Sequence, residues 1–137
     1  MFSMEMDMYA ETLIEAYEHP QNKGALEKPA VSMDEENISC GDKITVYLEV
    51  DAGRIKEIKF QGSGCIISMA SAELLIDELR GKTLGDVKSM TKEDLLKIIN
   101  IDPGPVRMHC ATLALRAIKK AVFAYLHEPL DSSTKEL

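Results

Sequence analysis

The sequence predicts an α+β domain in which helices pack on one face of a small antiparallel three-stranded sheet. Alternating apolar and polar residues in the first half of the chain indicate strands joined by a tight turn, and helical periodicity replaces this alternation after residue 64. The strands precede the helices instead of alternating with them, so a parallel sheet is not expected. The 137 residues suit one domain. We therefore expect a single domain over 1–137, with a flexible tail at 130–137.

The predicted strands centre on the segment DKITVYLEVDAGRIKEIKF. Ile44, Val46 and Leu48 alternate with more polar residues, which is typical of a strand with one buried face. DAGR is predicted to form a hairpin turn, after which the chain returns as a second strand over 54–60. The third strand is predicted somewhere within 30–37.

Helices are predicted before and after these strands. The expected ranges are 4–18, 65–79, a short helix or turn at 83–90, a capped helix at 91–100, and a long last helix over 106–128. On the last helix the apolar residues share one face, so that Arg116, Lys119 and Lys120 are expected to face solvent.

Charge and hydropathy exclude several classes of partner. The formal net charge is −7 and the chain has no cluster of basic residues, which argues against binding to nucleic acid. The apolar runs are only a few residues long, and the acidic N-terminal segment does not resemble a signal peptide. We expect no membrane association and a cytoplasmic location.

The three cysteines are the main candidates for chemistry. Cys40, Cys65 and Cys110 cannot all pair in disulfides, and a reducing compartment would keep them as thiols, so metal or thiol chemistry is the alternative to simple burial. Cys65 follows Gly-Ser-Gly and Cys110 follows Pro-Gly-Pro. Both are predicted in the first turn of a helix, where free N–H groups and the helix dipole favour a thiolate.

Two further side chains could complete a metal site. Asp42 lies two residues after Cys40, and His109 directly precedes Cys110. Three thiolates with one of these two ligands would satisfy tetrahedral zinc or a [2Fe–2S] cluster. The spacing is not that of paired C-x-x-C zinc motifs, so the pattern leaves burial of the cysteines, a solvated Asp42 and an exposed helical His109 open.

The motifs C-G-D, G-S-G-C and H-C-A-T-L-A occur in that order. With the sequences around them, NISCGDKITVYLEV and PVRMHCATLALRAIKKAV among them, they closely resemble the IscU/SufU/NifU-N-terminal group of iron–sulfur cluster scaffold proteins. The similarity extends from YEHPQNKGAL to about Tyr125. It implies a SufE/NifU-like fold for the predicted sheet and helices.

The resemblance also implies a function and a set of ligands. Cys40, Cys65 and Cys110 would hold a nascent cluster, [2Fe–2S] first with [4Fe–4S] as the alternative, and zinc would bind in the cluster-free form. Asp42 would modulate cluster stability and exchange, and His109 would lie beside the cluster or ligate it. The implied partners are a cysteine desulfurase, which delivers sulfur, and apo iron–sulfur acceptor proteins. The protein would be a scaffold and not an enzyme, and a homodimer is left open.

Two departures from the family pattern refine this expectation. The segment PGPVR stands where scaffolds served by a dedicated Hsp70 chaperone carry Leu-Pro-Pro-Val-Lys, which makes that chaperone a doubtful partner. GCIISMAS resembles the SufU branch, but the chain lacks that branch's longer insertion before the third cysteine and has His109, so we place it with IscU. A SufU-like zinc-containing sulfurtransferase is the alternative. A Cys110–His109 hydrolase is disfavoured because adjacent helical residues do not readily form a nucleophile–base pair.

Overall fold

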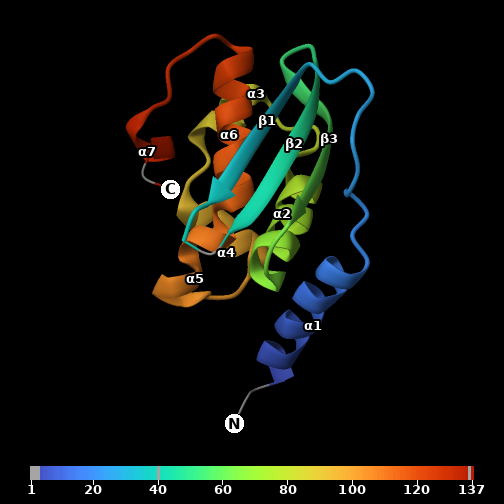
Figure 1. Ribbon diagram of the computed structural model, residues 1–137, viewed down its shortest axis with the longest axis vertical. Helices are drawn as coiled ribbons and strands as arrows, with labels where there is room; N and C mark the ends of the chain where they lie inside the picture. The colour runs from blue at the N-terminus through green and yellow to red at the C-terminus, as the bar shows by residue number, and fades with distance from the viewer. Residues whose placement is uncertain (1–3, 40, 136) are drawn as a thin grey trace.

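The fold is a three-stranded antiparallel sheet covered on one face by helices (Figure 1). The computed structural model describes residues 4–39, 41–135 and 137. The strands are β1 (Val31–Asn37), β2 (Asp42–Asp51) and β3 (Arg54–Ser63), in the order β1-β2-β3. The predicted fold class is confirmed, including a partner strand between residues 30 and 37.

The β2–β3 hairpin has the turn that its sequence predicts. Ala52 and Gly53 both have positive φ, 52° and 76°, as the tight turn of a twisted hairpin requires. A bulge between Glu49 and Val50 shifts the register near this turn. At the end of the sheet away from this turn lie the β1–β2 connection, the end of β3 and α5 (Gly104–Ala111), as Figure 1 shows.

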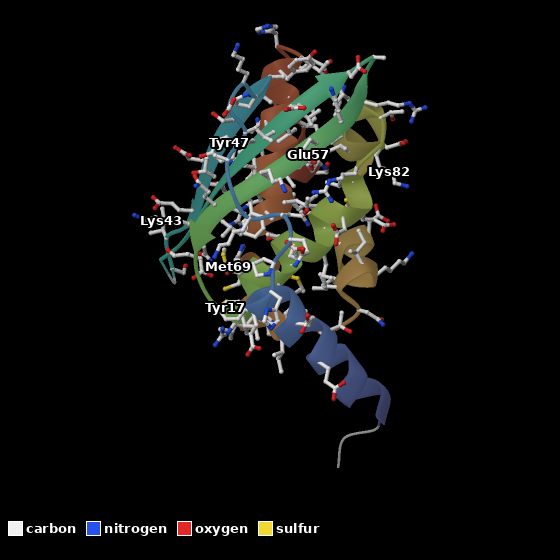
Figure 2. The ribbon with its side chains drawn as sticks, turned by 90° about the vertical axis from the view of Figure 1, so that its right-hand side faces the viewer. Tyr17, Lys43, Tyr47, Glu57, Met69 and Lys82 are labelled. Carbon is white, nitrogen blue, oxygen red and sulfur yellow. The ribbon has the colours of Figure 1, made fainter. Side chains whose placement is uncertain are left out.

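The two faces of the sheet differ in polarity. Ile44, Val46 and Leu48 of β2 are buried, and α6 (Leu113–Tyr125) packs against β1 and β2 while α2 (Ile66–Leu79) packs against β3. The other face carries polar side chains, among them Tyr47, whose hydroxyl donates to Gln61 Oε1 at 2.7 Å (Figure 2). The apolar core therefore lies on one side of the sheet only.

The remaining helices surround this core. They are α1 (Met4–Glu18), α3 (Leu84–Ser89), α4 (Lys92–Ile99) and α7 (Ser132–Lys135). α1 packs against α2, and α4 begins with a capping box formed by Thr91 and Asp94. Within the described part of the chain, no helix is long and apolar enough to cross a membrane.

The prediction of one long C-terminal helix over 106–128 is wrong in one respect, because the structure has two helices there, divided at Thr112. The chain forms α5 before this residue and α6 after it. Thr112 is buried, and its ψ of −1° turns the backbone away from helical geometry. α5 packs against α2, whereas α6 follows the sheet. Because of this division, α5 and α6 do not form one continuous helix and can pack against different elements.

Lys119 was expected to face solvent, and this expectation is also wrong. Its side chain is buried on α6, and Nζ donates to the carbonyl of Met90 at 2.7 Å. Burial lowers the pKa of Lys119, although the carboxylates of Asp131 and Asp94 oppose the effect. The carbonyl partner and the two nearby carboxylates explain how a charge is accommodated on the inner side of the helix.

The segment expected to be a flexible tail contains α7. Asp131 Oδ1 accepts hydrogen bonds from the backbone N–H and the hydroxyl of Thr134, at 2.9 and 2.6 Å. Thr134 is fully buried, and α7 packs against α6. This end of the chain therefore covers part of the core.

Candidate metal site

Three of the predicted site residues meet at the end of the sheet away from the hairpin turn. A carboxylate oxygen of Asp42 and the sulfur atoms of Cys65 and Cys110 all lie within 4.8 Å of one another. Asp42 begins β2, Cys65 occupies the N-cap position of α2, and Cys110 lies near the end of α5. We call these three side chains the thiol–carboxylate cluster. Cys40 lies outside the described residues.

Asp42 is held where β1 turns into β2. It is the register partner of Asn37, and the backbone N–H of Gly41 donates to the Asn37 carbonyl at 2.8 Å. Gly41 has a φ of 77°, which glycine adopts without strain. The Asp42 side chain is only 5% exposed. The tight connection thus points a carboxylate inward at the very start of the strand.

Cys65 is presented by the Gly-Ser-Gly segment that ends β3. A Cβ atom at Gly64 would come within 2.6 Å of Ser68 Oγ and 2.8 Å of Asp42 Cγ, so a larger residue would force these two side chains to move. Cys65 is half-buried, and its Sγ lies 3.6 Å from Ser68 Oγ. The missing side chain at position 64 is what allows Asp42, Ser68 and Cys65 to share one small space.

The surroundings of Cys65 favour the thiolate. Burial raises the pKa of the thiol, but hydrogen bonds from the backbone and hydroxyl of Ser68 outweigh burial, and the pKa falls below its ordinary value. The Asp42 charge raises the pKa and the Cys110 thiol lowers it, each to a smaller extent. The predicted benefit of a helix start therefore holds for Cys65, which occupies the N-cap position.

Cys110 is not in the first turn of a helix, as the sequence had suggested. α5 begins at Gly104, so Cys110 is close to the C-terminal end of that helix, where the dipole does not favour a thiolate. The prediction failed because the Pro-Gly-Pro segment enters the helix itself. Cys110 is 3% exposed, and the side-chain amide of Asn37 donates to its sulfur at 3.7 Å.

His109 is exposed on α5. In the part of the chain that the structure describes, it is not a member of the thiol–carboxylate cluster. Neighbouring residues on a helix point about 100° apart, so a buried Cys110 directs the preceding side chain elsewhere. The structure therefore brings Asp42 to the two thiols and does not bring His109 to them.

Sequence reasoning missed three residues that build the site. They are Asn37, Gly64 and Ser68. Asn37 stands three residues before the C-G-D motif, where an amide at a strand end could have been noticed. Ser68 stands three residues after Cys65, which is the spacing of an N-terminal helical turn. Gly64 carried the clearest signal, since a glycine directly before a predicted ligand indicates close backbone approach.

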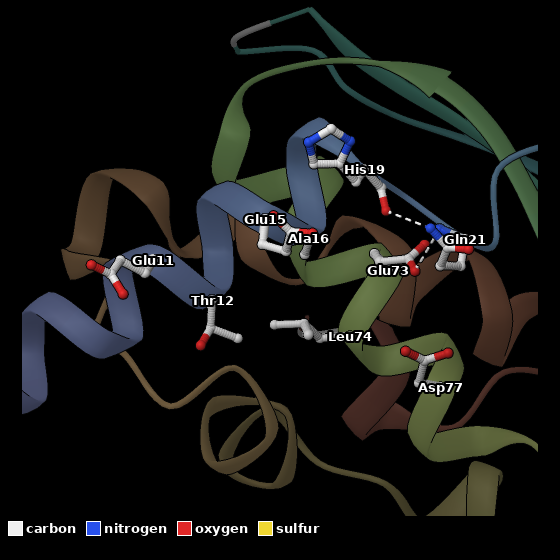
Figure 3. Close-up of a pocket in the computed structure, with 9 residues that line it drawn as sticks. All are labelled: Glu11, Thr12, Glu15, Ala16, His19, Gln21, Glu73, Leu74 and Asp77. Carbon is white, nitrogen blue, oxygen red and sulfur yellow. Dashed lines mark hydrogen bonds between the residues drawn. The ribbon is translucent and has the colours of Figure 1, made fainter.

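A separate hollow lies between α1 and α2 (Figure 3). Its volume is about 610 Å³, and it is lined by Glu11, Thr12, Glu15, Ala16, His19, Gln21, Glu73, Leu74 and Asp77. The buried Glu73 carboxylate already accepts hydrogen bonds from the backbone N–H groups of Gln21 and Asn22, at 2.9 and 3.0 Å. Asp77 Oδ1 accepts a hydrogen bond from the side-chain amide of Asn22 at 2.9 Å. These carboxylates thus hold the segment after α1 against α2.

The thiol–carboxylate cluster has the chemistry of a metal site. Thiolates are soft ligands that bind zinc and iron–sulfur clusters, and a carboxylate adds a harder, more readily exchanged ligand. The cluster combines a buried thiol with a half-exposed one, so bound metal would be reachable from solvent. The donor set therefore fits zinc or iron and leaves room for further ligands.

Comparison with known proteins agrees with this chemistry. The family model of the NifU-like N terminal domain matches residues 8–131. The iron–sulfur cluster assembly scaffold protein IscU of Thermotoga maritima is 33% identical over 84% of this chain and 92% of its own length. The zinc-dependent sulfurtransferase SufU of Bacillus subtilis is 31% identical over 88% of this chain and 94% of its own length.

Solved structures share the fold. The N-terminal part of a NifU-like protein from Brucella abortus superimposes with a TM-score of 0.74 and 17% identity, covering 93% of this chain and 100% of that one. A scaffold protein described for the SUF system of Fervidobacterium islandicum gives a TM-score of 0.70 and 23% identity, covering 85% of this chain and 97% of its own. At these identities the similarity concerns the fold alone.

Proposed function

Because the chain belongs to the family of NifU-like N-terminal domains, we propose that it is a scaffold on which an iron–sulfur cluster is assembled and from which the cluster passes to acceptor proteins. The observation that carries the proposal is the meeting of Cys65, Cys110 and Asp42 within 4.8 Å. Two thiols and a carboxylate from three separate elements meet there. If the cysteines were only small buried hydrophobic residues, nothing would explain why a carboxylate lies beside them.

The third thiolate of the proposed site is Cys40. Its sequence neighbours Ser39 and Gly41 both donate backbone hydrogen bonds to Asn37, to the side-chain and the main-chain oxygen respectively. Asn37 in turn donates to Cys110. The residues on either side of Cys40 are therefore hydrogen-bonded to the residue that contacts Cys110, which supports the proposal of a three-cysteine site.

We propose a [2Fe–2S] cluster as the cargo, with sulfur supplied by a cysteine desulfurase and Asp42 or His109 completing the ligands. Two iron atoms need four protein ligands in such a cluster, and three thiolates leave one position open. Asp42 already lies with Cys65 and Cys110, whereas His109 would have to turn toward them. A carboxylate is the weaker ligand for cluster iron, which suits a protein that must release its cargo.

A zinc-dependent sulfurtransferase is the second candidate, favoured by the relative with that name and by the same donors. Zinc is commonly bound by two or three thiolates, with a carboxylate or a water molecule completing its four ligands, so the same residues could hold it. In this function the protein would pass sulfur while holding zinc and would build no cluster.

The test is anaerobic assembly with ferrous iron, cysteine, a cysteine desulfurase and a reductant. The parent is expected to gain visible absorption together with iron and sulfide, and to pass both to an apo-ferredoxin. Cys65→Ser and Cys110→Ser are expected to lose stable cluster, while Ser63→Ala, a change at an exposed residue of the same segment, keeps it. A parent that holds zinc, relays sulfur and forms no chromophore would instead establish the second candidate.

A further inference from the structure

We propose that Asn37 is a positioning residue whose side-chain amide orients the sulfur of Cys110 and tunes the metal that this sulfur binds. The tuning part of the proposal rests on the proposed function, whereas the hydrogen bond itself does not. Asn37 is the last residue of β1 and is 8% exposed, so its amide faces the interior of the site and not water.

The two ends of the Asn37 side chain have different partners. Oδ1 accepts a hydrogen bond from the backbone N–H of Ser39 at 3.2 Å, and Nδ2 donates to Cys110 Sγ at 3.7 Å. The oxygen therefore shapes the β1–β2 connection, and the nitrogen contacts a sulfur from α5. A residue needed only for the turn could be an aspartate, which offers the same acceptor without the donor.

The Nδ2 contact has a direct chemical consequence. A donor hydrogen bond withdraws electron density from a thiolate, so the sulfur donates less strongly to a bound metal, and the reduced form of a cluster is stabilised. The helix dipole does not help Cys110, because this residue lies near the C-terminal end of α5. The amide of Asn37 is a neutral, buried donor to this sulfur.

The first experiment examines the hydrogen bond in the metal-free protein. In ¹H–¹⁵N spectra, Cys110→Ala is expected to shift the side-chain amide resonances of Asn37 and to speed their exchange with water. The side-chain amide of Asn100, an exposed residue at the end of α4, serves as the internal reference and is expected not to move. Unchanged Asn37 resonances would overturn the proposal whether or not the protein binds a cluster.

The second experiment examines the tuning with Co²⁺ as the probe metal. Asn37→Asp keeps the acceptor for Ser39, and Asn37→Leu keeps the volume but removes both partners. Both variants are expected to move the sulfur-to-cobalt charge-transfer band to lower energy, because the sulfur donates more strongly without the hydrogen bond. Co²⁺ binding is nevertheless expected to weaken, by about tenfold or more, because the sulfur loses the contact that holds its orientation. Asn100→Asp is the matched control for the change from amide to carboxylate and is expected to behave as the parent.

The outcomes separate the two proposals. If Asn37→Asp keeps the parent's band and affinity while Asn37→Leu loses them, Asn37 only shapes the connection and the positioning role is wrong. If the parent itself shows no sulfur-to-cobalt band, the proposed function fails, and the amide resonances still decide whether Asn37 binds Cys110. Thermal unfolding of each variant identifies one that does not fold, in which case the resonance experiment on Cys110→Ala decides.

Discussion

Gly64 lies so close to Asp42 that a Cβ atom at position 64 would stand 2.8 Å from the Asp42 carboxyl carbon. The same atom would stand 2.6 Å from the hydroxyl oxygen of Ser68. The absence of a side chain at this glycine thus decides whether the carboxylate and the Cys65 thiol can approach one metal.

Gly64→Ala is expected to separate Asp42 from Cys65 and to lower metal affinity by about tenfold or more. The overpacked interior should also reduce the free energy of unfolding by roughly 1 to 3 kcal/mol. Competitive zinc titration and thermal unfolding measure the two effects. Gly85→Ala is the control, because a Cβ there meets only Thr83 Oγ1, at 3.8 Å. Zinc affinity equal to the parent's would show that Asp42 and Ser68 do not share the site with Cys65 as described.

Asp42→Ala is expected to lengthen the lifetime of an assembled cluster. The carboxylate is a hard ligand that carries negative charge beside anionic sulfur, so its removal should favour retention over exchange. Transfer to an apo-ferredoxin should become slower, by about threefold or more. The neighbouring change Lys43→Ala, at an exposed residue, should leave the rate unaltered. Transfer as fast as in the parent counts against an exchange role for Asp42.

His109→Ala is expected to weaken zinc binding much less than Cys110→Ala does. The histidine is exposed and stands outside the thiol–carboxylate cluster, whereas the cysteine sulfur is one of its three members. We expect a loss of less than about threefold for the histidine change and of more than about tenfold for the cysteine change. Equal losses in the two variants would mean that α5 rotates on metal binding to bring His109 in.

Asp131→Ala is expected to destabilise the protein by about 1 kcal/mol at neutral pH, because it removes the cap of α7. Hydrogen bonds from the Thr134 hydroxyl and backbone lower the pKa of Asp131 from 3.8 to about 2. The folded state therefore binds this proton less tightly than the unfolded state, so the cap's contribution is complete above about pH 4 and is lost as the pH falls through about 2.

Thermal unfolding of the parent and of Asp131→Ala at about pH 7 and about pH 2 checks this dependence. The difference between their midpoints should shrink at the lower pH. Ser132→Ala, at the exposed neighbouring residue, is the control and should match the parent at both values. A difference that does not change with pH would mean that the charge of Asp131 contributes nothing to the cap.

The sheet and most helices were predictable because their signals are local. The β2–β3 hairpin combines strict alternation with a glycine, Gly53, that adopts a positive φ without strain, and α4 begins with its own capping box. The division at Thr112 has no such signal, since helix-forming residues continue on both sides of it. It follows from packing, because α5 contacts α2 and α6 contacts the sheet.

The candidate site was predictable in its residue types but not in its arrangement. The motifs named Cys65, Cys110 and Asp42, which the structure brings together. The donor to Cys110 was missed because Asn37 reaches it from a strand 73 residues earlier in the chain. Lys119 was misplaced for the same kind of reason, since the Met90 carbonyl that it contacts belongs to the α3–α4 junction. Long-range contacts of this kind leave no pattern in a single sequence.

The separation of the two cluster sulfurs along the chain has a consequence for the whole molecule. Cys65 and Cys110 lie 45 residues apart in sequence, and the intervening chain forms all of α2, α3 and α4, and most of α5. A metal ion or cluster bound to both is a reversible cross-link across that loop. By the loop-entropy estimate for a covalent bridge, such a cross-link is worth up to about 4 kcal/mol. The protein with bound metal or cluster should accordingly resist heat and proteases better than the protein without it. Transfer of the cluster to an acceptor removes this cross-link.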